Sequence, residues 1–149
     1  MYVRGVRGAL GWCVADHISA LPDVTAVVSP GDVPATADGA GFDTIVEIGL
    51  ADHDVLGRRG ASPTIGTAEL LADADRVGAT QLVLVSSAMV YGAIANNPVP
   101  LTEEAVLRPD PHFAYARQLA GAEELVESWR TARAGRRVAV LRPAIPVAA

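Results

Sequence analysis

Short aliphatic segments alternate with amphipathic segments of helical spacing along the chain, and no other feature limits the possible folds as much. Strands are predicted at residues 2–3, 24–28, 43–49, 81–86 and 138–141, and helices at residues 9–21, 64–77 and 113–133. This alternation is typical of an α/β domain with a mostly parallel sheet. Residues 81–86 are nearly all aliphatic, which suits a strand that is buried on both faces. Residues 29–42 and the proline-rich residues 93–111 are predicted to be loops.

The composition indicates a single globular domain and excludes some classes of function. With 149 residues, half of them hydrophobic, the chain has the size of one domain with a substantial core. All 12 basic residues are arginines, the net charge is −5 and no basic run occurs, so nucleic acid is not expected as a partner. Cys13 is the one cysteine, which excludes an internal disulfide and suits a cytoplasmic location; it is expected to be a small core residue. We expect neither a membrane span nor a secretory signal, because the apolar runs are too short.

A glycine motif follows the first predicted strand. Gly5, Gly8 and Gly11 have the spacing G-x-x-G-x-x-G between that strand and the first predicted helix. Glycines let backbone N–H groups approach a pyrophosphate, and the N-terminus of the helix contributes the positive end of its dipole. The motif therefore predicts a dinucleotide cradle. The alternative is a tight turn that only packs the helix on the sheet.

Two residues near the motif concern the ribose of such a cofactor. A dinucleotide fold expects an acidic residue at the end of the second strand, where it binds the ribose 2′-hydroxyl. The first carboxylate after Val28 is Asp32, which reaches the ribose only if its loop turns back and is otherwise a solvated loop residue. Arg7 is a candidate to contact a 2′-phosphate, so both NAD and NADP stay open.

Further motifs, taken together, resemble one family. They are Asp43-Thr44-Ile45-Val46, Gly66-Thr67-Ala68-Glu69-Leu70-Leu71, Val85-Ser86-Ser87-Ala88-Met89-Val90-Tyr91-Gly92, Pro100-Leu101-Thr102-Glu103-Glu104, Pro109-Asp110-Pro111 and Val140-Leu141-Arg142-Pro143, besides the glycine motif and Tyr115. With these motifs the chain resembles the extended short-chain dehydrogenase/reductases, the NAD-dependent epimerase/dehydratase family that includes nucleotide-sugar epimerases and dehydratases. The resemblance covers nearly the whole chain, but only about the first half of such a protein.

The resemblance implies a fold, a cofactor and site residues. The fold is a Rossmann-type, doubly wound and mostly parallel sheet, in one NAD(P)-binding domain over residues 1–149. The cofactor is NAD or NADP, with Ser87 and Tyr115 as the catalytic serine and tyrosine and Ser86 among the cofactor-binding residues. A nucleotide sugar or another small hydroxylated compound is the implied substrate. In this family the helix predicted at residues 113–133 commonly lines a dimer interface, so we expect a homo- or hetero-oligomer.

The chain departs from the family's pattern where the catalytic lysine belongs. A tyrosine that exchanges a proton with a substrate hydroxyl needs its pKa lowered from about 10, and a lysine one helical turn later does this. Leu119 stands at that position, and Arg117 points to a different side of the helix. The chain also ends at Ala149, just after Leu141-Arg142-Pro143, where the family's substrate-binding region is expected to begin.

Two hypotheses about function follow from these matches and departures. In the first, the chain binds NAD or NADP and has weak or no independent catalysis. In the second, it is a non-catalytic pseudoenzyme that acts as a partner or interaction subunit and no longer binds a cofactor. No metal site is expected, because the three histidines lack the spacing of metal ligands. Glu123, Glu124 and Glu127 are expected on the solvated face of the last helix.

Overall fold

A parallel β-sheet forms the middle layer of the molecule, and helices lie on both of its faces. The computed structural model describes residues 1–6, 8–28, 41–48 and 63–144. In these residues the strands are β1 (Tyr2–Arg4), β2 (Val27–Val28), β3 (Thr44–Glu47), β4 (Gln81–Val85) and β5 (Arg137–Leu141). The helices are α1 (Gly8–Ser19), α2 (Pro63–Val77) and α3 (Ala114–Thr131), with a short 3-10 helix, η4 (Ala88–Tyr91). The predicted α/β class is confirmed.

The order of the strands decides where a ligand can bind. The sheet runs β2-β1-β3-β4-β5, and all of its pairs are parallel. From β1 the chain moves outward to β2, and from β3 it moves the other way to β4 and β5, so the direction reverses between β1 and β3. In doubly wound sheets, ligands bind at the carboxyl ends of the strands beside such a reversal. The sheet is therefore of the Rossmann type, as predicted.

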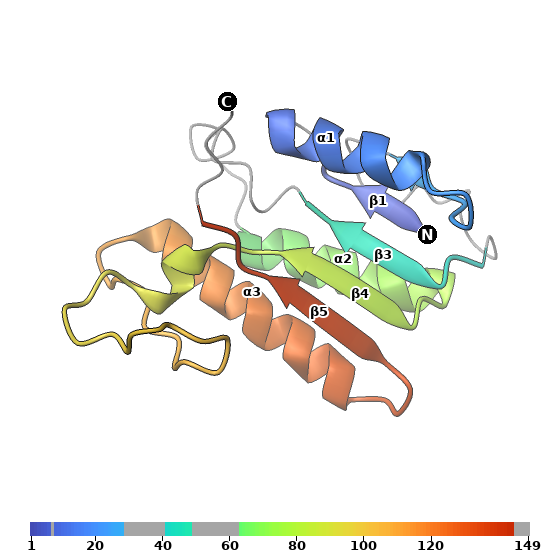
Figure 1. Cartoon of the computed structure of the whole chain (residues 1–149). Helices are drawn as coiled ribbons and strands as arrows, with labels where there is room; N and C mark the ends of the chain where they lie inside the picture. Colours follow the sequence, from blue (N-terminus) through green and yellow to red (C-terminus); the bar gives the residue numbers. More distant parts are fainter. Residues whose placement is uncertain (7, 29–40, 49–62, 145–149) are drawn as a thin grey trace.

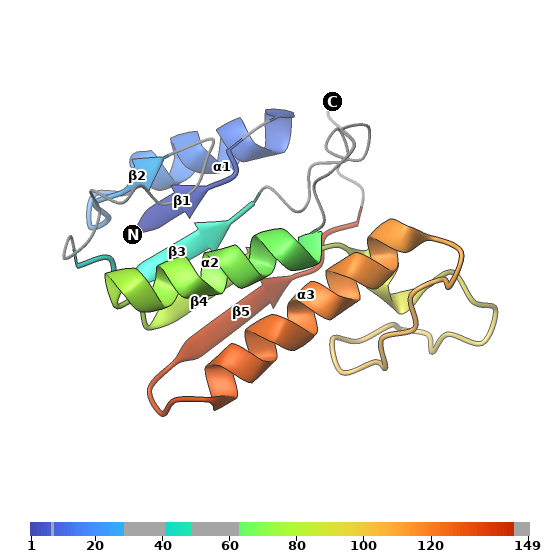
Figure 2. The same ribbon diagram turned by 180° about the vertical axis from the view of Figure 1, so that it is seen from behind.

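The reversal also distributes the helices between the two faces. Because crossovers between parallel strands are right-handed, connections that run in opposite directions place their helices on opposite faces. Accordingly, α1 lies on one face, and α2 and α3 lie on the other (Figures 1 and 2).

Side chains that alternate along the strands form two hydrophobic cores. The core on the α2 and α3 side joins the strand residues Tyr2, Ile45, Leu82 and Leu84 to Leu70, Ala74, Val126 and Trp129. The core on the α1 side joins Val3, Val46, Ile48 and Val85 to Ala15, with Val14 and Ile18 packed against it. Neighbouring residues of one strand enter opposite cores because side chains alternate across a sheet. Each fully buried aliphatic side chain contributes roughly 1.5–3 kcal/mol to folding.

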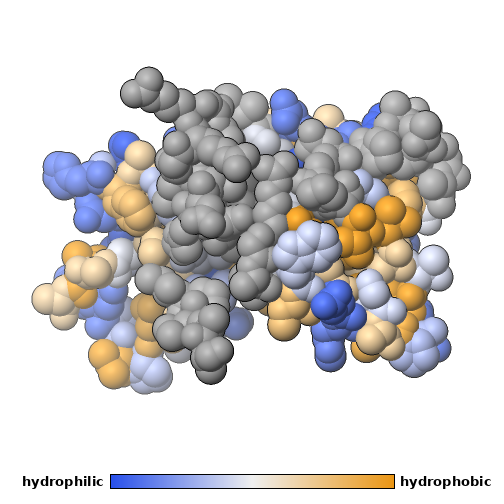
Figure 3. Space-filling view, turned by 90° about the horizontal axis from the view of Figure 1, so that it is seen from above, coloured by the Kyte–Doolittle hydropathy of each residue, from blue (hydrophilic) through white to orange (hydrophobic). Residues whose placement is uncertain are grey.

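The α1 face of the sheet is covered less completely toward β5. Leu82 and Leu84 are buried on the other face, whereas Val83 is half-buried and Leu141 is 52% exposed. The prediction that residues 81–86 are buried on both faces therefore holds only in part. Figure 3, which views the molecule from the α1 side, shows apolar side chains gathered beside polar ones on the described surface.

Two details of the N-terminal region differ from the predictions. Strand β2 begins at Val27 instead of the predicted residue 24, because Val27 is the partner of Tyr2, the first residue of β1, and residues 24–26 come before it. Cys13 is exposed, so the prediction that it is a core residue is wrong. The buried side of α1 faces the sheet through Ala15 and Gly11, and Cys13 lies on the opposite side of the helix.

Near the amino end of β5, the C-terminal part of α3 is fixed by a polar cluster. The indole N–H of Trp129 donates to Oδ1 of Asp75 on α2 at 3.0 Å. Arg136 forms an ion pair with Asp75 and donates from Nη1 to the carbonyl oxygen of Trp129 at 2.8 Å. The guanidinium carbon of Arg136 lies 4.1 Å from the centre of the Trp129 ring, within the range of a cation–π contact. The cluster joins α2, α3 and the turn that leads into β5.

Candidate functional site

The glycine motif forms a tight turn between β1 and α1. Gly5 follows β1 with a φ of +73°, a conformation that favours glycine, and α1 begins at Gly8. A Cβ at Gly11 would lie 3.2 Å from the Cα of Val6, so glycine lets α1 approach the turn closely. The turn therefore places the N-terminus of α1 at the carboxyl end of β1, which is the geometry that binds phosphate groups.

A buried ion pair lies beside this turn, across the point where the strand order reverses. Arg4 and Glu47 are register partners on β1 and β3, and Nε of Arg4 lies 2.6 Å from Oε2 of Glu47. Nη1 of Arg4 lies 3.8 Å from Oδ2 of Asp73 on α2, so the pair faces α2. The α1 face of the same two strands carries the apolar side chains of Val3, Val46 and Ile48. The pair was not predicted from the sequence. A signal for it was available, because β1 and β3 each end in a charged residue and the two charges are opposite.

Two adjacent serines follow β4, and their hydroxyls have different partners. Ser86 is fully buried, and its Oγ donates to Oε1 of Glu123 on α3 at 2.5 Å. Ser87 is the N-cap of η4, where its Oγ accepts a hydrogen bond from the amide of Met89 at 3.3 Å. The structure thus ties Ser86 to α3, while Ser87 starts the short helix that packs on α3.

The predicted catalytic tyrosine and the residue at the lysine position lie in one apolar cluster. Val90 and Tyr91 of η4 pack with Tyr115, Leu119 and Ala120 of α3. Leu119 is fully buried and Tyr115 is buried. At this position the chain therefore has an aliphatic contact, where the family pattern expects a cation. Because η4 packs on α3, Ser87 and Tyr115 lie on two elements that are in contact.

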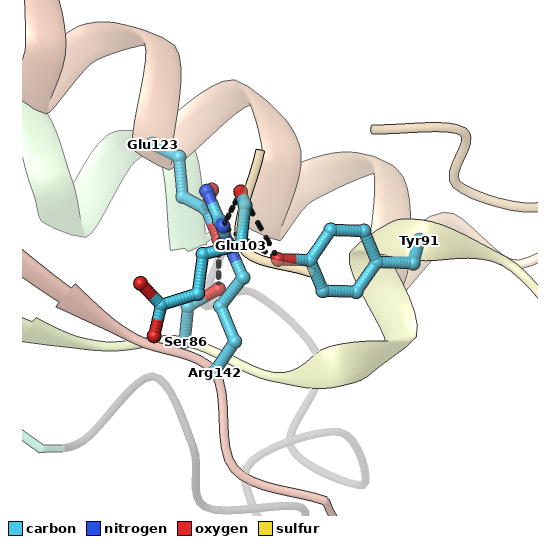
Figure 4. Close-up of polar contacts among 5 residues, drawn as sticks. All are labelled: Ser86, Tyr91, Glu103, Glu123 and Arg142. Atoms are coloured by element: carbon cyan, nitrogen blue, oxygen red, sulfur yellow. Dashed lines mark hydrogen bonds and ion pairs between the residues drawn. The ribbon is translucent and has the colours of Figure 1, made fainter. Parts of the chain in front are cut away.

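Arg142, the first residue after β5, connects several segments at this end of the sheet (Figure 4). Its Nε lies 3.2 and 3.1 Å from the two carboxylate oxygens of Glu123, and its Nη2 donates to Oε2 at 2.8 Å. Its Nη1 donates to the hydroxyl of Tyr91 at 2.7 Å and to the carbonyl oxygen of Glu103 at 3.2 Å. Together with the bond from Ser86, these contacts form what we call the Arg142 network. Hydrogen bonding to Glu123 raises the pKa of Arg142.

The burial of Glu123 corrects a prediction from the sequence. Its side chain is 5% exposed and belongs to the Arg142 network, whereas Glu124 and Glu127 are exposed as predicted. A signal for this was available, since Glu123 stands four residues after Leu119 and eight after Tyr115. That spacing places all three residues on one face of a helix.

A pocket of about 820 Å³ opens between α1, the sheet and the Arg142 network. Its floor consists of aliphatic side chains, and polar groups lie at the end where the strands finish. It is lined by Val14, Ile18, Val46, Ile48, Val83, Val85, Ala88, Tyr91, Leu101, Thr102, Glu103, Val140, Leu141, Arg142, Pro143 and Ala144. Ligand sites in proteins commonly have roughly 300–1,000 Å³ and a mostly apolar lining with a few polar groups.

Some predicted residues cannot be placed in this site. Arg7 and Asp32 lie outside the described residues, and so does His53, one of the three histidines. His17 and His112 are exposed, and the described part of the chain holds no group of three or more His, Cys, Asp or Glu that could bind a metal ion. None of its helices is both long and apolar enough to cross a membrane.

Comparison with protein families gives one match, over more than half of the chain. The model of the NAD dependent epimerase/dehydratase family matches residues 58–148, which contain the two serines, Tyr115 and the Arg142 network. A search of curated proteins gave no significant match.

Solved structures of similar fold come from several bacteria. The chain superposes with a TM-score of 0.71 and 22% identity on RMD from Pseudomonas aeruginosa complexed with NADPH, covering 96% of this chain and 52% of that one. For DesIV, a dTDP-glucose 4,6-dehydratase from Streptomyces venezuelae with NAD and DAU bound, the TM-score is 0.68, the identity 22% and the coverages 95% and 54%. For a short-chain dehydrogenase/reductase superfamily protein from Agrobacterium tumefaciens with bound NAD, the TM-score is 0.71 and the identity 23%, and the match covers 95% of this chain and 48% of that one. The chain spans about half the length of these structures.

Proposed function

The chain belongs to the NAD dependent epimerase/dehydratase family, and from this we propose that it is a domain that binds NAD or NADP and has weak or no catalysis of its own. The close approach of α1 to the turn after β1, which Gly11 allows, is the observation that supports binding most directly. A side chain at that position would push the helix away from the turn. The residues present therefore fit the pyrophosphate of a dinucleotide.

The glycine motif and the N-terminus of α1 suggest how the cofactor would be held. Backbone N–H groups at Gly5 and Gly8 and the N-terminus of α1 would face the pyrophosphate. When bound, the nicotinamide supplies the capacity to accept or donate a hydride. Ser87 and Tyr115 are the proposed serine and tyrosine for a substrate hydroxyl, for which a nucleotide sugar is the proposed source; both are buried between η4 and α3 and do not line the 820 Å³ pocket. The neighbouring DesIV and RMD structures contain NAD and NADPH respectively, which supports the cofactor class.

The chain's own residues argue for weak proton transfer. A cation one helical turn after Tyr115 would stabilise the phenolate, but that position is held by the buried, aliphatic Leu119. General acid–base assistance contributes roughly 10²–10⁴ in rate. Without a lysine to stabilise the Tyr115 phenolate, a large part of this rate enhancement is expected to be lost. Binding depends on the glycine turn and is affected less. We therefore propose cofactor binding in the cytoplasm as the primary property, with turnover secondary.

A second candidate function is that of a non-catalytic partner subunit. Apolar side chains exposed on the loop after η4 support it, above all Val99, which is 96% exposed, and Val106. Exposed apolar groups of this kind mark contact surfaces when they lie together. In this function the chain would form a homo- or hetero-oligomer and would no longer need a cofactor.

Titration with NADH and with NADPH tests the first proposal. Trp12 stands directly after Gly11 on α1 and is 57% exposed, so its fluorescence should be quenched by energy transfer to a bound reduced nicotinamide. We expect saturable quenching by at least one of the two cofactors. The variant Trp12→Phe assigns the signal, since Trp129 is buried at the other end of the sheet. No saturation up to about 1 mM, a binding free energy weaker than roughly 4 kcal/mol, would contradict cofactor binding and favour the partner function.

A matched pair of variants checks that the cradle is responsible. Gly8→Asp places a negative charge at the first residue of α1, where it repels a pyrophosphate and yet suits a helix N-terminus. Ser19→Asp adds the same charge at the last residue of the same helix. Quenching should be lost in the first variant and kept in the second. Equal behaviour of the two variants would mean that the cofactor binds elsewhere.

A further inference from the structure

The direction in which a dinucleotide would lie follows from the strand order. Its pyrophosphate belongs at the N-terminus of α1, beside the carboxyl end of β1. In doubly wound sheets, the adenosine half extends toward the strand that follows the first helix, which here is β2. The other half must then extend across the ends of β3, β4 and β5. The 820 Å³ pocket meets that path at Ile48, Val85 and Arg142, and from there it extends over the α1 face of the sheet to Val83, Val14 and Ile18.

The polar wall of this pocket is built around Arg142. Of the network, Tyr91, Glu103 and Arg142 line the pocket, while Ser86 and Glu123 stand behind them. Two nitrogens of Arg142, Nε and Nη2, donate hydrogen bonds to the Glu123 carboxylate. The third, Nη1, donates to the hydroxyl of Tyr91 and to the carbonyl oxygen of Glu103. Both the aromatic ring of η4 and the loop at Glu103 are thereby held against the end of β5.

The charges in the network restrict what the pocket accepts. The guanidinium of Arg142 is paired with the buried carboxylate of Glu123 at 2.8 Å, so the two together are neutral. A neutral pair offers little attraction to a phosphate. An uncharged, hydroxylated ring system suits an aliphatic floor with a neutral polar wall, and the reduced nicotinamide riboside is such a group.

We infer that Arg142, braced by Glu123, is a positioning residue for the nicotinamide half of a bound dinucleotide. The inference rests on the proposed function, because it requires that a dinucleotide binds. Arg142 acts through Tyr91 and the loop at Glu103, which it holds as the wall of the pocket. Losing the brace should weaken the contacts of the nicotinamide half and leave those of the ADP half intact.

Calorimetric titration with two ligands separates positioning from general damage. NADH contains the nicotinamide, whereas ADP-ribose lacks it and keeps the pyrophosphate and the adenosine. Tyr91→Phe removes the hydroxyl that accepts from Arg142 and keeps the ring. The double variant Glu123→Met/Arg142→Met removes the buried charges together, which avoids leaving one of them unpaired. In both variants we expect NADH to bind roughly tenfold more weakly, a change of about 1.4 kcal/mol, and ADP-ribose to bind unchanged.

Arg136→Met is the matched control. Arg136 also pairs with a carboxylate and contacts an aromatic ring, but it does so at the amino end of β5. The control should lower stability without changing the ratio of the two affinities. Equal weakening of NADH and ADP-ribose in the Tyr91 and double variants would overturn the inference, as would unchanged NADH binding. If the unaltered protein bound neither ligand, the proposed function itself would fail, which is a different result.

Discussion

Tyr115 and Leu119 lie one turn apart on α3 and are buried in the same apolar cluster, with Val90 and Tyr91 of η4 packed against them. The residue at the position of the family's lysine is therefore a structural contact between α3 and η4. Its side chain fills space that a flexible, charged side chain would have to share with the Tyr91 ring. Leu119 therefore replaces a cation with a side chain that takes part in the packing of η4 on α3.

Leu119→Lys is expected to destabilise the protein even though it restores the family's residue. The ammonium would enter an apolar cluster in which Leu119 is fully buried, and the leucine contacts would be lost. Truncation of a buried leucine to alanine costs about 2–5 kcal/mol, and a lysine would lose part of the same packing and would in addition bury a charge. Leu125→Lys, at a half-buried position on the same helix, is the control and should cost less. Chemical denaturation measures both. If the two variants were equally stable, the apolar cluster would tolerate a cation, and a lysine beside Tyr115 could be restored without loss of stability.

Gly92→Ala is expected to disrupt the loop after η4. Gly92 has a φ of +68°, and a Cβ there would collide with the carbonyl oxygen of Arg108. Strain and overlap together should cost more than about 1 kcal/mol. Gly66→Ala is the control, because Gly66 lies inside α2 with nothing near a new Cβ, and alanine in a helix stabilises by roughly 0.5–1 kcal/mol. Opposite shifts in melting temperature are the expected result, and shifts of the same sign would contradict it.

Much of the fold could be predicted because its signals are local. The aliphatic runs of β3 and β4 and the helical spacing of α2 and α3 gave the elements to within a few residues. The start of β2 at Val27 could not be predicted, since it depends on where β1 begins in the register of the two strands. The exposure of Cys13 depends on which side of α1 faces the sheet, and Gly11 sets that side through its contact with Val6.

The candidate site was predicted less completely, because its polar contacts join distant parts of the chain. Ser87, Tyr115 and the glycine turn are read from short motifs, and their roles stay predictions. The pairing of Glu123 with Arg142 spans 19 residues and requires α3 to lie beside the end of β5. The pairing of Arg4 with Glu47 requires the register of β1 and β3. A sequence pattern indicates which residues are charged, but tertiary structure decides which charges meet.

Ser86→Ala and Ser87→Ala should differ in their effects on stability, although the two serines are adjacent. The Ser86 hydroxyl is buried and donates to the charged Glu123, and such a bond contributes about 1.5–3 kcal/mol. The Ser87 hydroxyl caps η4 with a longer bond of 3.3 Å, and losing a cap costs roughly 0.5–2 kcal/mol. Equilibrium unfolding of both variants should therefore show the larger loss for Ser86→Ala. The reverse order would show that the η4 cap matters more than the Arg142 network.

Glu127→Gln should have a small effect that disappears in acid. Hydrogen bonding to Arg130, one turn later on α3, lowers the pKa of Glu127 from its ordinary 4.5. A carboxyl group whose pKa is lowered by folding contributes its stability above the unfolded pKa, and the contribution is lost as the pH falls through the folded value. The pair is exposed to solvent, so its contribution at neutral pH should be far smaller than that of the buried Glu123. Melting temperatures of Glu127→Gln and the unaltered protein should differ slightly at neutral pH and coincide well below pH 4.5. A difference that grew in acid would show that Glu127 is not stabilised by Arg130.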